Sequence, residues 1–136
     1  TVAWADAQRE AAFHAWLAPL ATGDAGSAPV LDLTPMREIF GAITDDVRQL
    51  LALFLETTRP QVEDAIAQLA AGECNAARES AHAAKGAGNS AGCYRFAAVC
   101  SEVEVLCTQG ELERARVLAP LMRTAFDEAA AEIDRV

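Results

Sequence analysis

The sequence predicts an all-α protein: an antiparallel up-and-down four-helix bundle with one or two additional N-terminal helices. Three observations lead to this prediction. The composition is 52% hydrophobic but only 6% aromatic, which suits closely spaced helices better than a strand-rich sandwich. Apolar residues recur with the 3.6-residue helical period, and no strand pattern interrupts them. The connections between the helical stretches are short, which makes successive helices antiparallel neighbours.

The first 30 residues are expected to form a segment apart from the bundle. Residues 3–20 carry a helical apolar stripe, which predicts an amphipathic helix. The stripe consists of Phe13, Trp16, Leu17 and Leu20. The next ten residues are rich in Gly, Ser, Ala and Pro and indicate a linker. We therefore divide the chain into an N-terminal helix with its linker, 1–30, and the bundle, 31–136. His14 lies beside Phe13 and Trp16, and a packing role is expected for it.

Capping residues and glycines predict the helix boundaries within the bundle. Thr34 is expected to be the N-cap of a short helix with Pro35 at its first position, and Thr44 opens the next helix. Pro60 is expected to kink or break that second helix. Three further helices are expected over Asn75–Ala91, Tyr94–Gln109 and Glu111–Ile133. The predicted helix stops are Gly41, Gly72, Gly92 and Gly110.

Charge and cysteine usage exclude several classes of function. The net charge of −9 argues against a duplex-binding surface, and no signal peptide or membrane-spanning stretch is visible. We therefore expect a cytoplasmic protein with no nucleic-acid partner and no membrane contact by this segment. The four cysteines lack the paired spacing of a zinc or thioredoxin-like site, so a metal centre is not expected. Cys93, Cys100 and Cys107 recur every seven residues and are expected to be buried as small hydrophobes.

The helix over 75–91 separates into a small-residue face and a polar face. The expected buried side consists of Ala77, Ala81, Ala84, Gly88 and Ala91. The polar side consists of Arg78, His82, Lys85, Gly86 and Asn89. Gly86 is one turn after the histidine, where alanine would stabilise the helix by about 0.8–1 kcal/mol, so we interpret Gly86 as clearance for an approaching partner. His82 and Lys85 would repel each other if both were charged, and a phosphoryl anion on His82 would resolve that conflict.

These residues resemble the histidine-containing phosphotransfer (HPt) domains of bacterial multistep phosphorelays. His82, Lys85, Gly86 and Gly92 fit the spacing H-x-x-K-G-x-x-x-x-x-G, and LDLTPMREIFGAITDDVRQLLALFL is similar to the opening helices of the family. The resemblance covers residues 31 to about 130. It implies that His82 accepts a phosphoryl group from an aspartate of one receiver domain and passes it to an aspartate of another, with Lys85 orienting the phosphate.

The same resemblance implies a phosphocarrier rather than an enzyme. The chain has no Gly-rich ATP-binding loop, so no cofactor of its own is expected, and the receiver's acidic pocket supplies the Mg²⁺ that in-line transfer needs. The expected partners are response-regulator receiver domains. A parent or cognate hybrid sensor kinase is a further candidate, and the chain is either free-standing or part of such a kinase.

The helix that follows runs antiparallel beside His82 and offers a residue to orient the imidazole. Glu104 is the candidate acceptor for Nδ1, which would leave Nε2 free as the nucleophile. Glu102 and Ser101 remain alternatives, because the crossing angle of the two helices decides which side chain reaches the ring. The alternative function for the whole chain is a helical interaction or dimerisation module in which phosphotransfer has lapsed.

Overall fold

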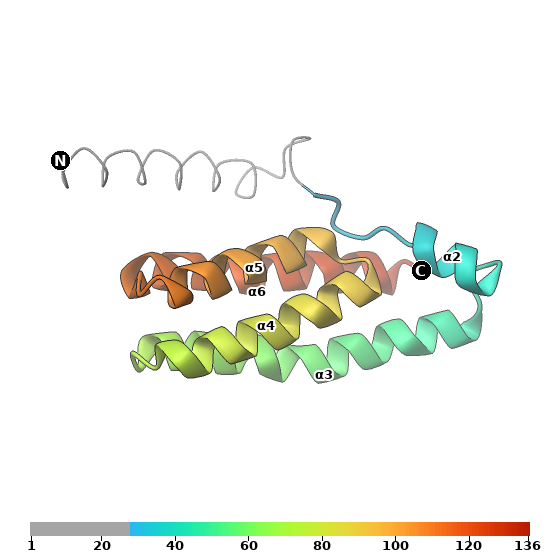
Figure 1. The fold of residues 1–136 in the computed structure, drawn as a ribbon. Helices are drawn as coiled ribbons and strands as arrows, with labels where there is room; N and C mark the ends of the chain where they lie inside the picture. The colour runs from blue at the N-terminus through green and yellow to red at the C-terminus, as the bar shows by residue number, and fades with distance from the viewer. Residues whose placement is uncertain (1–27) are drawn as a thin grey trace.

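A computed structural model describes residues 28–136, and all its regular elements are helices (Figure 1). The predicted amphipathic helix, His14 and most of the linker lie outside the described residues. The helices are α2 (Thr34–Phe40), α3 (Asp45–Ala70), α4 (Cys74–Ala91), α5 (Tyr94–Thr108) and α6 (Leu112–Asp134). The short helix α2 precedes four long helices, which confirms the predicted fold class.

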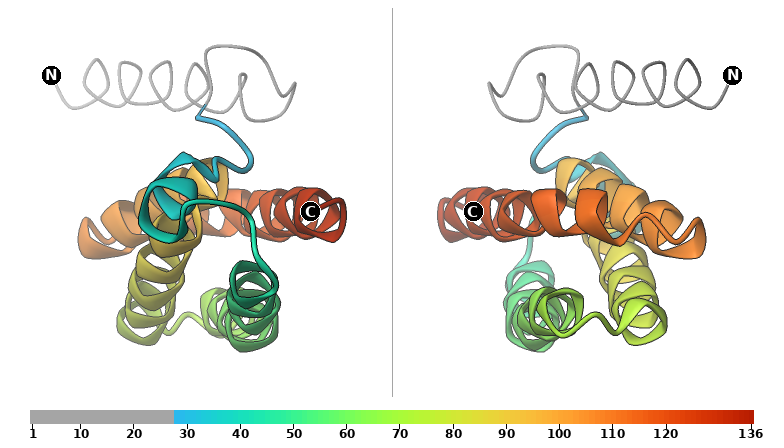
Figure 2. Two further views of the ribbon diagram at one scale, coloured as in Figure 1. Left: turned by 90° about the vertical axis from the view of Figure 1, so that its right-hand side faces the viewer. Right: turned by 90° about the vertical axis from the view of Figure 1, so that its left-hand side faces the viewer.

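The four long helices pack as a closed ring of neighbours. Helix α4 contacts α3 and α5, and α6 also contacts α3 and α5. Figure 2 views this bundle from its two ends, with α2 at one of them. Short connections join α3 to α4, α4 to α5 and α5 to α6, so each helix reverses the direction of the one before it. Helix α4 therefore lies between α3 and α5, with one side left open to solvent.

The core combines three aromatic rings with a helix of small residues. Phe54, Phe96 and Phe126 come from α3, α5 and α6, and their ring centroids lie 5.5–6.2 Å apart, within the range of favourable aromatic pairs. Helix α4 contributes only small side chains to this core, as the helical period predicts. Its buried residues are Ala77, Ala81, Ala84, Gly88 and Ala91. Cys93, Cys100 and Cys107 are also buried, as expected.

The helix boundaries follow the predicted signals with one correction. Gly41, Gly72, Gly92 and Gly110 all have φ between 73° and 82°, the left-handed conformation that ends a helix. The hydroxyl of Thr44 accepts a hydrogen bond from the backbone N–H of Val47, so Thr44 is the N-cap of α3. The prediction that Thr34 caps α2 was wrong. Thr34 is already helical, and its N–H donates to the carboxylate of Asp32 at 3.0 Å.

Pro60 does not break α3, which runs without interruption from Asp45 to Ala70. A proline removes one backbone donor and leaves the carbonyl four residues earlier without its usual partner. Here that carbonyl belongs to Glu56, and both Pro60 and Glu56 are exposed, so water can satisfy the carbonyl. Pro120 is likewise an exposed interior residue of α6. Burial of the apolar face of each helix therefore outweighs the proline penalty.

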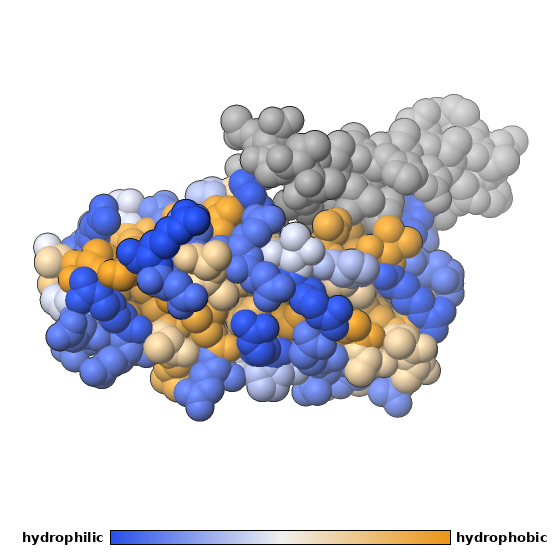
Figure 3. Space-filling view, turned by 180° about the vertical axis from the view of Figure 1, so that it is seen from behind, coloured by the Kyte–Doolittle hydropathy of each residue, from blue (hydrophilic) through white to orange (hydrophobic). Residues whose placement is uncertain are grey.

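Cross-helix ion pairs join the outer surfaces of α3 and α6. Arg123 binds both carboxylate oxygens of Glu63, at 3.0 and 2.7 Å, and the guanidinium of Arg59 lies 4.7 Å from the ring centroid of Phe126. Figure 3 views the molecule from behind and shows hydrophilic residues interspersed with smaller hydrophobic areas on that face. None of the helices within residues 28–136 is both long enough and apolar enough to cross a membrane.

Candidate functional site

His82 lies on the open side of α4, and its side chain is 66% exposed. The imidazole Nδ1 lies 2.9 Å from Oε1 of Glu104 on α5. A carboxylate only accepts hydrogen bonds, so this contact assigns the ring proton to Nδ1 and the lone pair to Nε2. The structure therefore brings the predicted acceptor to the imidazole. The imidazole is paired with Glu104 and not with either of the two alternatives, Glu102 and Ser101.

Lys85 contacts the same carboxylate from the other side. Its Nζ lies 2.7 Å from Oε2 of Glu104, so one carboxylate joins the imidazole to the ammonium group. Glu104 is 19% exposed and Lys85 is 28% exposed, whereas the imidazole extends into solvent. The three side chains form a compact triad with Glu104 at its base and His82 outermost.

The triad perturbs the ionisation of Glu104. The ammonium of Lys85 lowers the pKa of the Glu104 carboxyl, and the contact with His82 lowers it further, against the opposing effect of partial burial. Because the folded-state pKa is depressed, Glu104 contributes stability above its ordinary pKa. That contribution is lost as the pH falls through the lowered value. Near neutral pH the carboxylate is ionised and can accept from both neighbours.

This geometry changes one step of the sequence argument. The proximity of His82 and Lys85 pointed to an anion that would arrive on His82. The structure shows that Glu104 already supplies an anion to Lys85 and accepts the hydrogen bond from Nδ1 of His82. Lys85 therefore has a partner before any phosphoryl group is present, and it can serve a phosphoryl group only by sharing or leaving that partner.

The other residues of the polar face surround His82 without closing over it. Asn89 is exposed, Arg78 is partly exposed, and a Cβ built on Gly86 would meet nothing within 4 Å. Within residues 28–136, packing would therefore also allow a larger side chain at position 86. That observation fits the expected clearance for a partner but does not identify the partner.

Gly88 and Gly92, in contrast, are required by packing. A Cβ at Gly88 would lie 2.9 Å from Phe96 Cδ2 and 3.3 Å from Ala97 Cβ, so this glycine lets α5 approach α4 closely. Gly92 has φ of 82°, and a Cβ there would collide with the backbone carbonyl of Asp32. The N–H of Asp32 donates to the carbonyl of Gly92 at 2.8 Å. This contact ties the segment before α2 to the end of α4, the helix that carries His82.

An apolar groove beside the triad was missed by the sequence analysis. It has a volume of about 340 Å³ and runs between α2, α3 and the C-terminal half of α4. Leu50 and Leu53 are 46% and 53% exposed at this groove. The sequence signal for this groove was the run LLALFL, in which apolar residues occupy more positions than one face of a helix can bury. The remaining lining residues are Met36, Phe54, Thr57, Ala87, Ser90 and Ala91.

Comparison with known proteins agrees with this arrangement. A family model, the Hpt domain, matches residues 49–132. The crystal structure of histidine-containing phosphotransfer protein B (HptB) from Pseudomonas aeruginosa PAO1 matches with a TM-score of 0.71 and 30% identity, over 80% of this chain and 95% of that chain. No curated protein matches the chain.

The helical bundle and its exposed histidine fit the class of phosphocarrier domains. The chain belongs to the Hpt domain family, and its function is histidine phosphotransfer in a phosphorelay. Domains of this family exchange phosphoryl groups with response-regulator receiver domains. The comparisons favour this function over the alternative of an interaction module in which phosphotransfer has lapsed.

Glu104→Ala is expected to slow phosphoryl transfer to the chain by about ten-fold, because a charge-assisted hydrogen bond worth about 1.5–3 kcal/mol is lost. Without the carboxylate, the His82 proton is free to move from Nδ1 to Nε2. Nitrogen NMR of the imidazole should show that shift of tautomer. Glu102→Ala is the matched control on the same helix and should leave the tautomer unchanged. An unchanged tautomer in Glu104→Ala would show that Glu104 does not orient the ring.

Proposed function

We propose that His82 is the residue that carries the phosphoryl group, with Nε2 as the nucleophile. The observation that supports this proposal is the contact between Nδ1 and Glu104 on a ring that is two-thirds exposed. The contact holds the tautomer in which Nε2 has a lone pair and needs no base to remove a proton. The buried side of the ring is thereby anchored and the open side is reactive.

The transfer step follows from this tautomer. The Nε2 lone pair attacks the phosphorus of a receiver's aspartyl phosphate, an N–P bond forms, and the P–O bond to the aspartate breaks. The aspartate leaves as a carboxylate. The imidazole keeps its Nδ1 proton and becomes a cationic ring, which the carboxylate of Glu104 stabilises at 2.9 Å. Reversal of the same step passes the group to a second receiver.

Lys85 is proposed to stabilise the phosphoryl oxygens. Its ammonium group lies on a flexible four-carbon stem, and in the resting state it pairs with Oε2 of Glu104. A phosphoryl group brings about two negative charges to Nε2, and this charge competes with Glu104 for the ammonium. Lys85 would then be shared between the two anions, and its ammonium group and the cationic ring would offset part of the added negative charge.

The chain is proposed to need no cofactor of its own. Within residues 28–136, no three side chains of His, Cys, Asp or Glu converge in a way that could hold a metal ion. The carboxylate of the triad is also engaged by the imidazole of His82 and the ammonium of Lys85. We assign the Mg²⁺ that screens the phosphoryl oxygens to the acidic pocket of the receiver domain.

The docking surface for the receiver is proposed to combine the polar face of α4 with the adjacent apolar groove. Arg78, Gly86 and Asn89 surround the histidine, and Leu50 and Leu53 provide exposed apolar area next to them. An apolar patch with a polar rim is the usual composition of a protein interface. A parent or cognate hybrid sensor kinase that carries a receiver would use the same surface.

Transfer of radiolabel tests the proposal. A receiver domain labelled on its aspartate is mixed with the chain, and the label is expected to move to the chain as an acid-labile, alkali-stable phosphohistidine. Label that stays on every receiver offered would count against a carrier role. Label that moves to an acid-stable bond would count against a histidine acceptor.

Gly86→Gln is expected to slow this transfer by at least about ten-fold while the fold is retained, because the added side chain extends into the space that a docked receiver would occupy. Gly86→Ala is the matched control. It should stabilise the helix by about 0.8–1 kcal/mol and slow transfer much less. Stopped-flow or rapid-quench transfer rates compare the two variants. Equal rates for Gly86→Gln and the wild-type chain would remove the clearance argument.

A further inference from the structure

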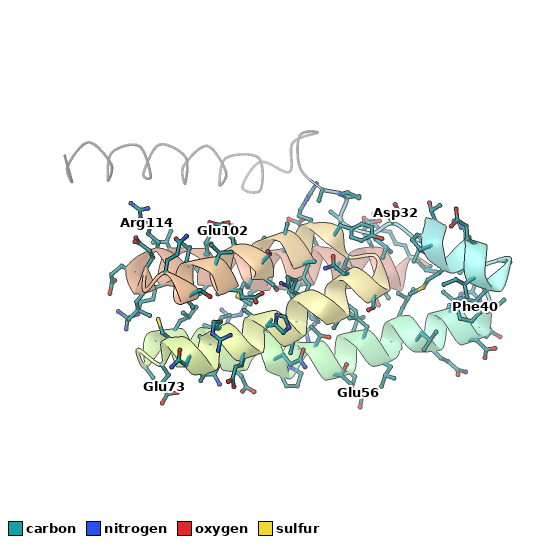
Figure 4. The ribbon with its side chains drawn as sticks, viewed as in Figure 1. Asp32, Phe40, Glu56, Glu73, Glu102 and Arg114 are labelled. Atoms are coloured by element: carbon teal, nitrogen blue, oxygen red, sulfur yellow. The ribbon has the colours of Figure 1, made fainter. Side chains whose placement is uncertain are left out.

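Two cysteines meet at the end of the bundle where α4 begins and α5 ends. Cys74 is the first residue of α4, and Cys107 is the last residue but one of α5. The two helices are antiparallel and in contact, so these termini lie together. Figure 4 labels Glu73, the residue before Cys74, at the end of the bundle remote from Asp32. The side chain of Cys74 also interacts with the thiol of Cys107 and helps to raise its pKa.

The four cysteines differ in their access to solvent. Cys93, Cys100 and Cys107 are buried, and Cys74 is partly exposed. Only the Cys74–Cys107 pair therefore combines a thiol that a small solute can reach with a second thiol in direct contact. The sequence spacing did not reveal this pair, because Cys74 lies outside the seven-residue series formed by the other three.

We propose that Cys74 and Cys107 form a reversible disulfide when the protein meets a hydroperoxide. The accessible thiol of Cys74 takes one oxygen atom from the peroxide, which is reduced to water or an alcohol, and becomes a sulfenic acid. The sulfur of Cys107 attacks the sulfenic sulfur, an S–S bond forms, and the sulfenic hydroxyl leaves with the Cys107 proton as water. Two thiols are oxidised by one peroxide, so electrons and atoms balance.

The neighbourhood fits a resolving thiol that is protected until Cys74 reacts. Burial and the contact with Cys74 raise the pKa of Cys107 to about 11, and the guanidinium of Arg78 opposes this rise. Cys107 is therefore held as a thiol and is a poor first target for the oxidant. Its contact with Cys74 places it at the sulfur that is oxidised first.

The disulfide would link α4, which carries His82, to α5, which carries Glu104. Cys107 comes one turn after Glu104, and Cys74 starts the helix that carries His82. A cross-link here fixes the start of α4 against the end of α5. It also lowers the conformational entropy of the unfolded chain, which stabilises the folded state. The oxidised protein is expected to unfold roughly 5–10 °C above the reduced protein.

Peroxide treatment of the full chain tests this inference without any use of phosphotransfer. Of the four free thiols, two should remain, the mass should fall by two hydrogen atoms, and a peptide joining Cys74 to Cys107 should appear. Dithiothreitol should reverse all three changes. Cys74→Ser and Cys107→Ser should each abolish the cross-link, and Cys93→Ala is the matched control that should retain it. Four unreacted thiols, a cross-link to another cysteine, or Cys74 sulfinic acid beside an intact Cys107 thiol would each overturn the proposal.

Discussion

His82→Gln is expected to reduce phosphoryl acceptance by the chain to background. Glutamine has no ring nitrogen to form an N–P bond, but its amide can still donate to Glu104. The fold should survive, because the imidazole is 66% exposed and its replacement removes no core packing. We expect the free energy of unfolding to change by no more than about 0.5–1 kcal/mol. Label transfer from a phosphorylated receiver and urea denaturation measure the two effects separately.

His14→Gln is the matched control, because His14 is the other histidine of the chain. It should accept label at the wild-type rate. Label that reaches His82→Gln as efficiently as the wild-type chain would remove His82 as the acceptor, and loss of label in His14→Gln alone would move the site. A folded His82→Gln protein that still binds the receiver would show that docking and chemistry are separable.

Gly92→Ala is expected to give the largest loss of stability among the single substitutions considered, about 2–4 kcal/mol. Two causes add at this position. The backbone is left-handed, with φ of 82°, and the new Cβ would collide with the backbone carbonyl of Asp32. That carbonyl cannot move away freely, because the N–H of Asp32 is bound to the Gly92 carbonyl at 2.8 Å. Relief of the collision must therefore break this tie.

Gly110→Ala separates the two causes. Gly110 has φ of 73°, but a Cβ there would meet nothing within 4 Å, so only the conformational cost of about 1–2 kcal/mol applies. The difference between the two variants in urea denaturation measures the contact with Asp32. If Gly92→Ala costs no more than Gly110→Ala, the tie between the α2 segment and α4 does not contribute to stability.

The local features of the site could be predicted because the helical period alone determines them. The period assigned His82, Lys85 and Gly86 to one face of α4 and the small residues to the other, and the structure agrees with that division. The choice between Glu104, Glu102 and Ser101 could not be made from the sequence. It depends on how α4 and α5 cross, and the close approach of the two helices at Gly88 and Phe96 cannot be read from the sequence.

Contacts between distant segments were beyond the sequence analysis for the same reason. Nothing in the local pattern indicates that Asp32 bonds to Gly92, or that Arg95 donates to the carbonyl of Ala28. The misplaced cap has a related cause, since Asp32 satisfies the N–H of Thr34 and the helix starts one residue earlier than expected. Pro60 does not break α3, because the carbonyl of Glu56, which loses its usual partner, belongs to an exposed residue. The sequence alone does not show that exposure.

The contrast between the two sides of α4 has an evolutionary consequence. On the inward side, any enlargement of an alanine or glycine would push α4 away from its neighbours, so selection should hold those positions nearly fixed. On the outward side, Arg78, Asn89 and Ser90 can be exchanged at little cost to folding. A duplicated copy of the gene could therefore acquire a new signalling partner by changes confined to the exposed face of α4, with His82 and the buried face left intact.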